Sequence, residues 1–358
     1  MNGKHIISIG LTAVLLFALT ACGAETEQEN LQSSSTSSNN IEVQKNIFAM
    51  DTYMTFKAYG TDADEALENI MTLITDLEDM LSVTDTDSAI SKVNIGHGTA
   101  TEIPDTVVEL VEEAQKISSQ TEGAFDISIY PVLKTWGFTT GNYQVPTAET
   151  LNTLLQYVDY TRIDLDTENN TITLPENMQI DLGGIAKGYA GQKAAESLKA
   201  QGIENALLNM GGNIQTVGSK PDGSDWTVAI QDPENTNQYV GYVQVSDKAV
   251  VTSGGYERYF EDANGHLWWH IMNPKTGYPA ESGLISVSVI GDDGMLCDVL
   301  STALFVMGLD KASTYWKTYG SFEAVFVTDN NEIYVTEGLK GNFKTMNNYK
   351  DKTVHIIK

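Results

Sequence analysis

The arrangement of secondary-structure patterns constrains this fold more than any other feature of the sequence. From Ile41 onward, helical and strand-like patterns are intermixed, without the regular strand–helix–strand repeat of a parallel α/β protein. Residues 62–83 and 104–121 carry apolar side chains three or four apart, which predicts two amphipathic helices. Short strand patterns with glycine-rich turns dominate the second half. We expect an α+β fold, a single domain over residues 43–358 of mixed or antiparallel sheets with flanking helices.

Other elements follow from the same patterns. Residues 123–138 combine bulky aromatic side chains with glycine and proline, which no single regular element explains. Helices are expected at 147–158, from the 181–190 segment to about 201, at 297–307 and at 311–319. Strands are expected at 48–59, around 163, and at 171–174, 206–209, 226–231, 240–245, 250–252, 268–272, 284–290, 324–328, 333–336 and 354–356.

The N-terminus has the features of a secretory leader. Lys4 precedes a short apolar stretch over residues 6–21, which ends in Leu19-Thr20-Ala21-Cys22. This tetrapeptide resembles the bacterial lipobox, in which the cysteine is acylated and becomes the mature N-terminus. We expect a lipoprotein signal peptide over 1–21 and a lipid on Cys22, which anchors the protein at the extracytoplasmic face of the cell membrane. The alternatives are a plain signal peptide cut near Ala21 and an uncleaved anchor.

Residues 22–42 are predicted to be a tether that follows the lipidated cysteine. The stretch 23–40 has no aromatic residue and is rich in serine and asparagine, so it cannot repay the entropy of ordering. Once Cys22 is acylated, Cys297 has no intrachain partner. We therefore expect a protein that meets an oxidising compartment with almost no thiols rather than with disulfides.

The net charge of the chain bears on which classes of macromolecule it can bind. The chain has 21 Lys and Arg residues against 48 Asp and Glu residues, a net charge of −27. It cannot supply the basic stripe that neutralises phosphate backbones, so we expect no nucleic acid partner.

Three glycine-rich segments are candidates for contact with an anionic ligand. Residues 181–190 place two glycines before a predicted helix start, where free backbone N–H groups and Lys187 can hold a phosphate. Paired glycines at strand ends in segments 209–213 and 252–255 let the chain approach a ligand closely. Each segment taken singly also fits an ordinary tight turn.

Two further segments hold side chains suited to catalysis or metal binding. His270 lies at a predicted strand end before an Asn-Pro turn, which gives a titratable group a rigid frame. The alternative is a half-buried imidazole without a ligand. Asp298 and Thr302 lie four apart in an apolar helix, so they share one face and can reach one hard cation. Alternatively, Asp298 caps that helix.

Together these segments resemble the ApbE family of FAD:protein FMN transferases, which are flavin transferase lipoproteins. The resemblance covers roughly Phe48 to the C-terminus. The matching stretches, seven in order, are residues 49–52, 125–126 with 136–138, 181–188, 209–212, 252–254, 270–277 and 298–302.

The resemblance implies a reaction and a set of site residues. In the family, Mg²⁺ bridges the diphosphate of FAD, and a Thr or Ser hydroxyl of a partner protein takes FMN and expels AMP. The implied Mg²⁺ ligands are the carbonyl of Ala186 and the side chains of Asp298 and Thr302. Lys187 would hold phosphate, and His270 and Asp298 are the implied catalytic residues. The residues expected to line the FAD site are Met50, Phe125, Asp126, Asp181, Gly211, Gly212, Ser253 and His270.

The expected acceptor is an extracytoplasmic electron-transfer protein with an FMN-binding domain, part of a membrane redox system. Two alternatives stay open. Water could replace the acceptor hydroxyl, which makes the protein an FAD pyrophosphatase, or the chain could be a non-catalytic flavin-binding lipoprotein.

The sequence departs from the family pattern at two positions. Asp51 stands where the family commonly has Gly, and it puts a carboxylate near an anionic ligand unless it faces away or helps the metal. Asn273 stands where the family commonly has Asp, and it should keep the turn.

Overall fold

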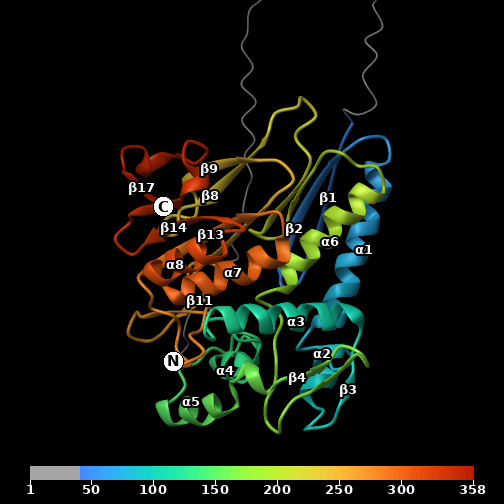
Figure 1. Cartoon of the computed structure of the whole chain (residues 1–358), viewed down its shortest axis with the longest axis vertical. Helices are drawn as coiled ribbons and strands as arrows, with labels where there is room; N and C mark the ends of the chain where they lie inside the picture. Colours follow the sequence, from blue (N-terminus) through green and yellow to red (C-terminus); the bar gives the residue numbers. More distant parts are fainter. Residues whose placement is uncertain (1–40) are drawn as a thin grey trace, which may run out of the picture.

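The computed structural model describes residues 41–358, so the predicted leader, Cys22 and nearly all of the tether lie outside the described residues. Its centre is a nine-stranded sheet in the order β1-β2-β6-β7-β10-β13-β14-β15-β17 (Figure 1). Every neighbouring pair is antiparallel except β15 and β17, which are parallel. The strands are β1 (Glu42–Ala49), β2 (Thr52–Tyr59), β6 (Ala206–Asn209), β7 (Ile214–Val217), β10 (Ala249–Gly254), β13 (Leu284–Gly291), β14 (Glu323–Thr328), β15 (Ile333–Thr336) and β17 (Val354–Ile357).

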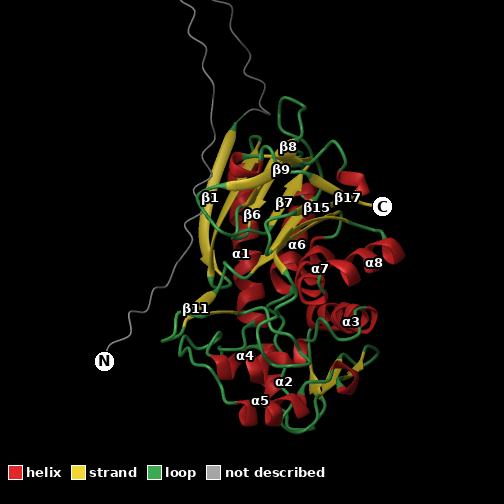
Figure 2. Cartoon of the chain, turned by 90° about the vertical axis from the view of Figure 1, so that its left-hand side faces the viewer, coloured by secondary structure: helices red, strands yellow, loops and turns green. Residues whose placement is uncertain are grey.

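Helices cover one face of this sheet and a smaller sheet covers the other (Figure 2). These helices are α1 (Ala63–Leu81), α6 (Ala186–Ala200), α7 (Gly294–Met307) and α8 (Leu309–Tyr319). A further helix, α3 (Asp105–Gln120), lies below them in Figure 1 and contacts α7. The smaller sheet pairs β16 (Lys344–Thr345), β9 (Tyr239–Val245) and β8 (Trp226–Gln231). Successive strand residues divide between the two cores: Val251 and Val289 pack with the helices, and Val250 and Ile290 with the smaller sheet.

A third apolar cluster lies among α4 (Tyr130–Trp136), α5 (Ala148–Leu154) and the hairpin β11 (Tyr259–Glu261) and β12 (Leu267–Trp269). Its centre is Trp136, whose indole N–H donates a 2.8 Å hydrogen bond to the carbonyl of Gly277. The Trp136 and Trp268 rings lie 5.0 Å apart. This cluster joins the aromatic segment 123–138 to the loop after His270. Below α3 in Figure 1 lie α2 (Ala89–Asn94) and the sheet of β3 (Thr101–Glu102), β5 (Thr171–Thr173) and β4 (Asp164–Asp166).

The predicted α+β class with antiparallel-rich sheets is confirmed, and the long predicted helices appear as α1, α3, α6, α7 and α8. The helix predicted at 147–158 ends at Leu154 and continues as a 3-10 turn. The strand predicted at 268–272 is β12, which ends before His270. Six of the helices and strands were not predicted from the sequence: α2, α4, β3, β7, β11 and β16.

The prediction of one strand over 48–59 is wrong. The segment is a hairpin in which Ala49 pairs with Thr52. Met50 and Asp51 form the two-residue turn with φ of 49° and 59°, the backbone twist that suits a tight hairpin. The residues on both sides are aromatic or favour strands, and the turn carries none of the usual glycine signal.

Candidate functional site

The centre of the site is the contact between the start of α6 and α7. The buried carboxylate of Asp298 accepts hydrogen bonds from the backbone N–H of Gly188 at 2.7 Å and from the side-chain amide of Asn213 at 3.1 Å. The cap of α7 is Asp293, whose side chain accepts from the N–H of Leu296. The alternative role of Asp298 as the helix cap is therefore excluded.

Lys187 is the positive charge that faces this carboxylate. Burial raises the pKa of Asp298, and the charge of Lys187 opposes that rise. Burial also raises the pKa of Glu257 to about 7, with Lys187 again lowering it and Asp298 raising it. The neighbouring Ala186 is the buried first residue of α6. The site thus concentrates two acidic groups around one lysine.

Three hydroxyl groups lie together where the end of β10 meets α7, one helical turn beyond Asp298. Ser253, at the end of β10, shares hydrogen bonds of 2.8 Å with Ser301 and 3.2 Å with Thr302. Thr302 is half-buried and follows Asp298 by four residues, as the sequence spacing predicted. The structure therefore brings Ser253, Asp298 and Thr302 to one region.

The loop between β6 and β7 carries the glycine pair of segment 209–213. The N–H groups of Gly211 and Gly212 both donate 3.0 Å hydrogen bonds to the side-chain oxygen of Asn209. Gly211 has a φ of 79°, and a Cβ there would lie 2.0 Å from the hydroxyl of Thr52. This glycine thus lets the loop approach the β1–β2 hairpin closely.

Asp181 and Phe125 lie beside the glycines that precede α6. Asp181 accepts a 2.7 Å hydrogen bond from the N–H of Gly183, and burial raises its pKa. The ring of Phe125 lies against Gly184, where a Cβ would come within 2.9 Å of the ring. These contacts place segments 123–126 and 181–188 side by side.

The structure gives Asp126 a local role. Its carboxylate accepts from the N–H and hydroxyl of Ser128 at 2.8 and 2.6 Å and from the N–H of Tyr160 at 3.0 Å. It therefore caps the 3-10 turn at Ile127–Ile129. Its contact with FAD stays a prediction.

His270 lies just after β12 and is half-buried. Its Nδ1 is 3.2 Å from the backbone carbonyl of Arg258. Loss of hydration and the charges of Arg258 and Lys187 lower the pKa of His270 to about 3, so the ring is neutral at pH 7. Asn273 keeps the expected turn, since its side-chain oxygen accepts from the N–H of Lys275 at 2.9 Å. Met50, in the hairpin turn, donates its N–H to Glu78 at 2.8 Å.

The sequence analysis missed four residues that belong to this region: Asn213, Glu257, Arg258 and Ser301. One signal was available for Arg258, because it is one of only two arginines in the chain and follows the 252–255 motif closely. Asn213 and Ser301 lie inside the segments 209–213 and 298–302 that were singled out, but neither was given a role, and Glu257 had no local signal.

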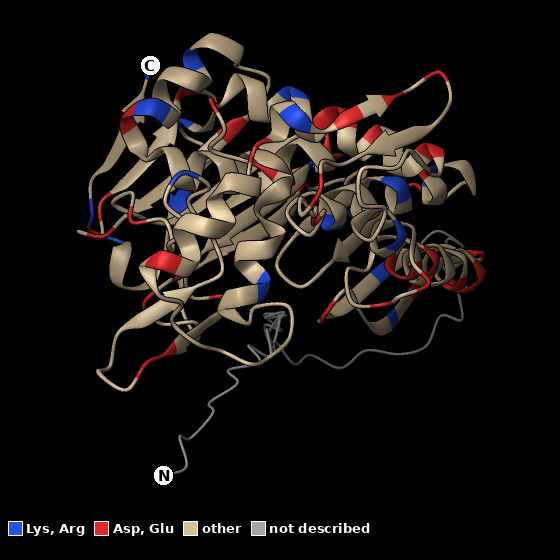
Figure 3. Cartoon of the chain, turned by 90° about the horizontal axis from the view of Figure 1, so that it is seen from below, with Lys and Arg blue, Asp and Glu red and all other residues tan. Residues whose placement is uncertain are grey.

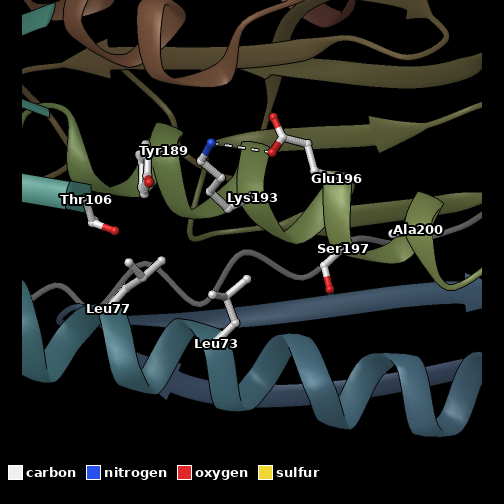
Figure 4. Close-up of a pocket in the computed structure, with 8 residues that line it drawn as sticks. All are labelled: Leu73, Leu77, Thr106, Tyr189, Lys193, Glu196, Ser197 and Ala200. Carbon is white, nitrogen blue, oxygen red and sulfur yellow. Dashed lines mark ion pairs between the residues drawn. The ribbon is translucent and has the colours of Figure 1, made fainter. Parts of the chain in front are cut away.

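A hollow of about 480 Å³ lies between α1 and α6, away from these residues (Figure 4). It is lined by Leu73, Leu77 and residues of α6, among them Lys193, which pairs with Glu196 at 3.5 Å. No predicted site residue lines it, so it is separate from the candidate site.

Within residues 41–358, no three side chains of His, Cys, Asp and Glu gather as a metal cluster, and no helix is long and apolar enough to cross a membrane. The oxygen groups of Asp298, Ser253 and Thr302 are hard donors of the kind that Mg²⁺ prefers. Seen from below, Lys and Arg residues lie scattered among the acidic ones (Figure 3).

Known proteins resemble this chain over most of its length. The model of the ApbE family matches residues 50–326. An FAD:protein FMN transferase of Klebsiella pneumoniae is 33% identical, with 76% of this chain and 85% of that protein covered. One of Treponema pallidum with the same name is 31% identical, over 79% and 82%.

Solved structures share the fold. The crystal structure of the ApbE protein from Thermotoga maritima has a TM-score of 0.79 and 30% identity, covering 84% of this chain and 99% of that one. The apo flavinyl transferase ApbE of Pseudomonas stutzeri has a TM-score of 0.75 and 28% identity, over 85% and 97%.

Proposed function

The chain belongs to the ApbE family, and on this premise we propose that it transfers FMN from FAD to a Thr or Ser hydroxyl of an extracytoplasmic flavoprotein and releases AMP, with Mg²⁺ as cofactor. The observation that carries the proposal is the buried Asp298 carboxylate, held against the start of α6 beside Lys187 and next to the hydroxyls of Ser253 and Thr302. Flavin transfer is the named activity of the relatives.

The residues present fit Mg²⁺. Burial makes the charge of Asp298 unfavourable unless a cation compensates it, and within residues 41–358 Lys187 is the cation that lowers its pKa. Asp298, Thr302 and the carbonyl of Ala186 would hold the metal, which neutralises charge on the diphosphate and on the leaving AMP when it is bound.

The residues of the chain position the reactants. Lys187 binds the diphosphate through its side chain. The N–H groups of Ala186 and Gly188 already donate to Leu182 and to Asp298, so they are not free for the phosphate that the sequence predicted there. The acceptor oxygen attacks the FMN-side phosphorus, a new P–O bond forms, and the P–O bond to the AMP phosphate breaks, so that AMP leaves with the bridging oxygen. Neutral His270 accepts the hydroxyl proton. A bound diphosphate adds negative charge beside Lys187. This charge raises the pKa of His270 from about 3, so the ring becomes a better base.

Mass spectrometry tests the proposal directly. The protein is incubated with FAD, Mg²⁺ and a purified FMN-binding acceptor domain. We expect the acceptor to gain the mass of FMN minus water on one Thr or Ser, with AMP released. Asp298→Ala should be inactive, and Asp292→Asn should be active because its side chain is 79% exposed and pairs only with Lys248.

Other outcomes identify the alternatives. Free FMN and AMP without labelled acceptor would show that water is the acceptor, and intact FAD that stays bound would show a flavin-binding lipoprotein.

We also propose that the chain is a lipoprotein at the extracytoplasmic face of the membrane, anchored through Cys22. Support comes from the lipobox-like Leu19-Thr20-Ala21-Cys22 and the tether after it. Mass analysis of the N-terminal peptide should find an acylated Cys22, and Cys22→Ser should release the protein from membranes. An unmodified N-terminus at or before Ala21 would refute the anchor.

A further inference from the structure

Arg258 connects two segments that are distant in the sequence. Its Nη2 lies 2.7 Å from a carboxylate oxygen of Asp51, at the tip of the β1–β2 hairpin. The same Nη2 donates a 2.9 Å hydrogen bond to the carbonyl of Phe138, at the end of the aromatic segment. One guanidinium therefore holds the hairpin, the aromatic segment and its own backbone in fixed relation.

The backbone of Arg258 contacts the residue expected to accept the proton. Its carbonyl oxygen accepts the backbone N–H of His270 at 3.1 Å and lies 3.2 Å from the ring Nδ1. A carbonyl cannot donate, so Nδ1 carries the proton of the neutral ring. The Nε2 atom is then the free acceptor.

We propose that Arg258 is a positioning residue that fixes the tautomer and orientation of His270, and that Asp51 holds Arg258 in place. The effect on catalysis rests on the proposed function, whereas the effect on the ring of His270 does not. Asp51 therefore does not leave an unpaired carboxylate near the anionic ligand, because its side chain pairs with Arg258.

The backbone at Asp51 favours glycine. Its φ of 59° lies in the left-handed region, where glycine is unstrained and aspartate is tolerated less well. Aspartate is one of the few other residue types that this backbone accepts, so the turn permits Asp51 and its carboxylate is free to pair with Arg258. Within residues 41–358, the ion pair with Arg258 is the one polar contact of the Asp51 side chain.

The ion pair by itself has a small effect. The Asp51 and Arg258 side chains are 67% and 44% exposed, and exposed pairs contribute little in water. Removing Asp51 should therefore lower kcat by about two- to fivefold. Removing the Arg258 side chain also frees the contact with Phe138, so Arg258→Gln should have the larger effect.

The first test reads the imidazole and needs no catalysis. In the whole chain labelled with ¹⁵N-histidine, His270→Gln identifies the signal of His270. We expect the Nδ1–H tautomer, and Arg258→Gln should shift it towards a mixture with Nε2–H. An Nε2–H tautomer in the parent chain, or a signal that Arg258→Gln leaves unchanged, would overturn the proposal even if the transfer reaction is confirmed.

The second test separates positioning from stability. Asp51→Gly should leave the thermal midpoint equal or higher, because glycine suits the turn, while kcat for acceptor labelling falls and KM for FAD stays within about twofold. Arg258→Lys should restore part of the kcat lost in Arg258→Gln. If kcat followed the thermal midpoint in these variants, the role would be structural only.

Asp247 provides the matched control. It also has a left-handed backbone, with φ of 51°, and an exposed ion pair, 2.8 Å to Lys199, but it lies in the turn before β10 away from His270. Asp247→Gly should leave kcat unchanged, and an equal loss in both glycine variants would refute a specific role for Asp51. If the parent chain transfers no FMN at all, the proposed function fails and the tautomer measurement alone decides this proposal.

Discussion

The backbone N–H of Gly188 on α6 donates a 2.7 Å hydrogen bond to Asp298 on α7, and the two helices leave no room for a side chain between them. A Cβ at Gly188 would lie 2.2 Å from the carbonyl oxygen of Gly294 and 2.5 Å from the Cβ of Asp298. The first of these atoms belongs to the backbone and the second is bonded directly to it. Neither can move aside by itself, so the two helices would have to separate.

Gly188→Ala should therefore lower both stability and activity. We expect a loss of about 1–3 kcal/mol in the free energy of unfolding, the range for overpacking, and a fall in FMN transfer because Asp298 moves. Gly191→Ala on the same helix is the control, since its Cβ would find its nearest atom at 3.5 Å. That variant should gain up to about 1 kcal/mol. Equal urea unfolding curves for the two variants would contradict the packing argument.

Asp298→Asn should separate metal binding from folding. The amide keeps an oxygen for the N–H of Gly188, and its NH2 group can donate to the side-chain oxygen of Asn213 once that amide turns over. It has no charge, and burial already makes that charge unfavourable in the folded state. We expect a folded protein whose FMN transfer is at least about a hundredfold slower. Mg²⁺ should raise the thermal midpoint of the parent chain only, because a ligand stabilises the state that binds it. An equal Mg²⁺ effect on both proteins would place the metal elsewhere.

Local sequence signals predicted those parts of the fold that are held by local periodicity. The helices α1 and α3 each have an apolar stripe that is buried in the core, so the spacing of their apolar residues was enough to predict them. The β1–β2 turn was missed because Met50 belongs to a residue type that rarely adopts a left-handed backbone, and no glycine marks the turn. That turn is held by contacts from elsewhere, including Arg258.

The candidate site shows the same limit. Asp298 and Thr302 were predicted to share a face because four residues make one helical turn. The contacts of Asn213 and Ser301 in the site depend on the sheet order, which brings β6, β7 and β10 beside α6 and α7. Contacts between residues so far apart in the sequence have no local signature.

Acidification should expose the low pKa of His270. The folded-state pKa of about 3 lies below the value of about 6.5 for a free histidine, so the unfolded chain binds more protons between these values. The protonation of His270 therefore leaves the free energy of unfolding unchanged above about pH 6.5. It lowers that free energy progressively as the pH falls towards 3. Urea unfolding of the parent and His270→Gln chains across this range measures the difference. Parallel curves would contradict the shift, and an imidazole NMR titration reads the pKa of His270 directly.

Cys297 should be chemically inert while the protein is folded. Its side chain is 1% exposed, and burial together with the charges of Asp293 and Asp298 raises the pKa of the thiol. Thiol reagents attack the thiolate, so both access and ionisation are suppressed. In a chain with Cys22→Ser, labelling should require denaturant, whereas an added Ser224→Cys on an exposed loop should react at once. Native labelling of Cys297 within about tenfold of the denatured rate would mean that α7 opens frequently, and the Asp298 carboxylate on the same helix would then be exposed to water as well.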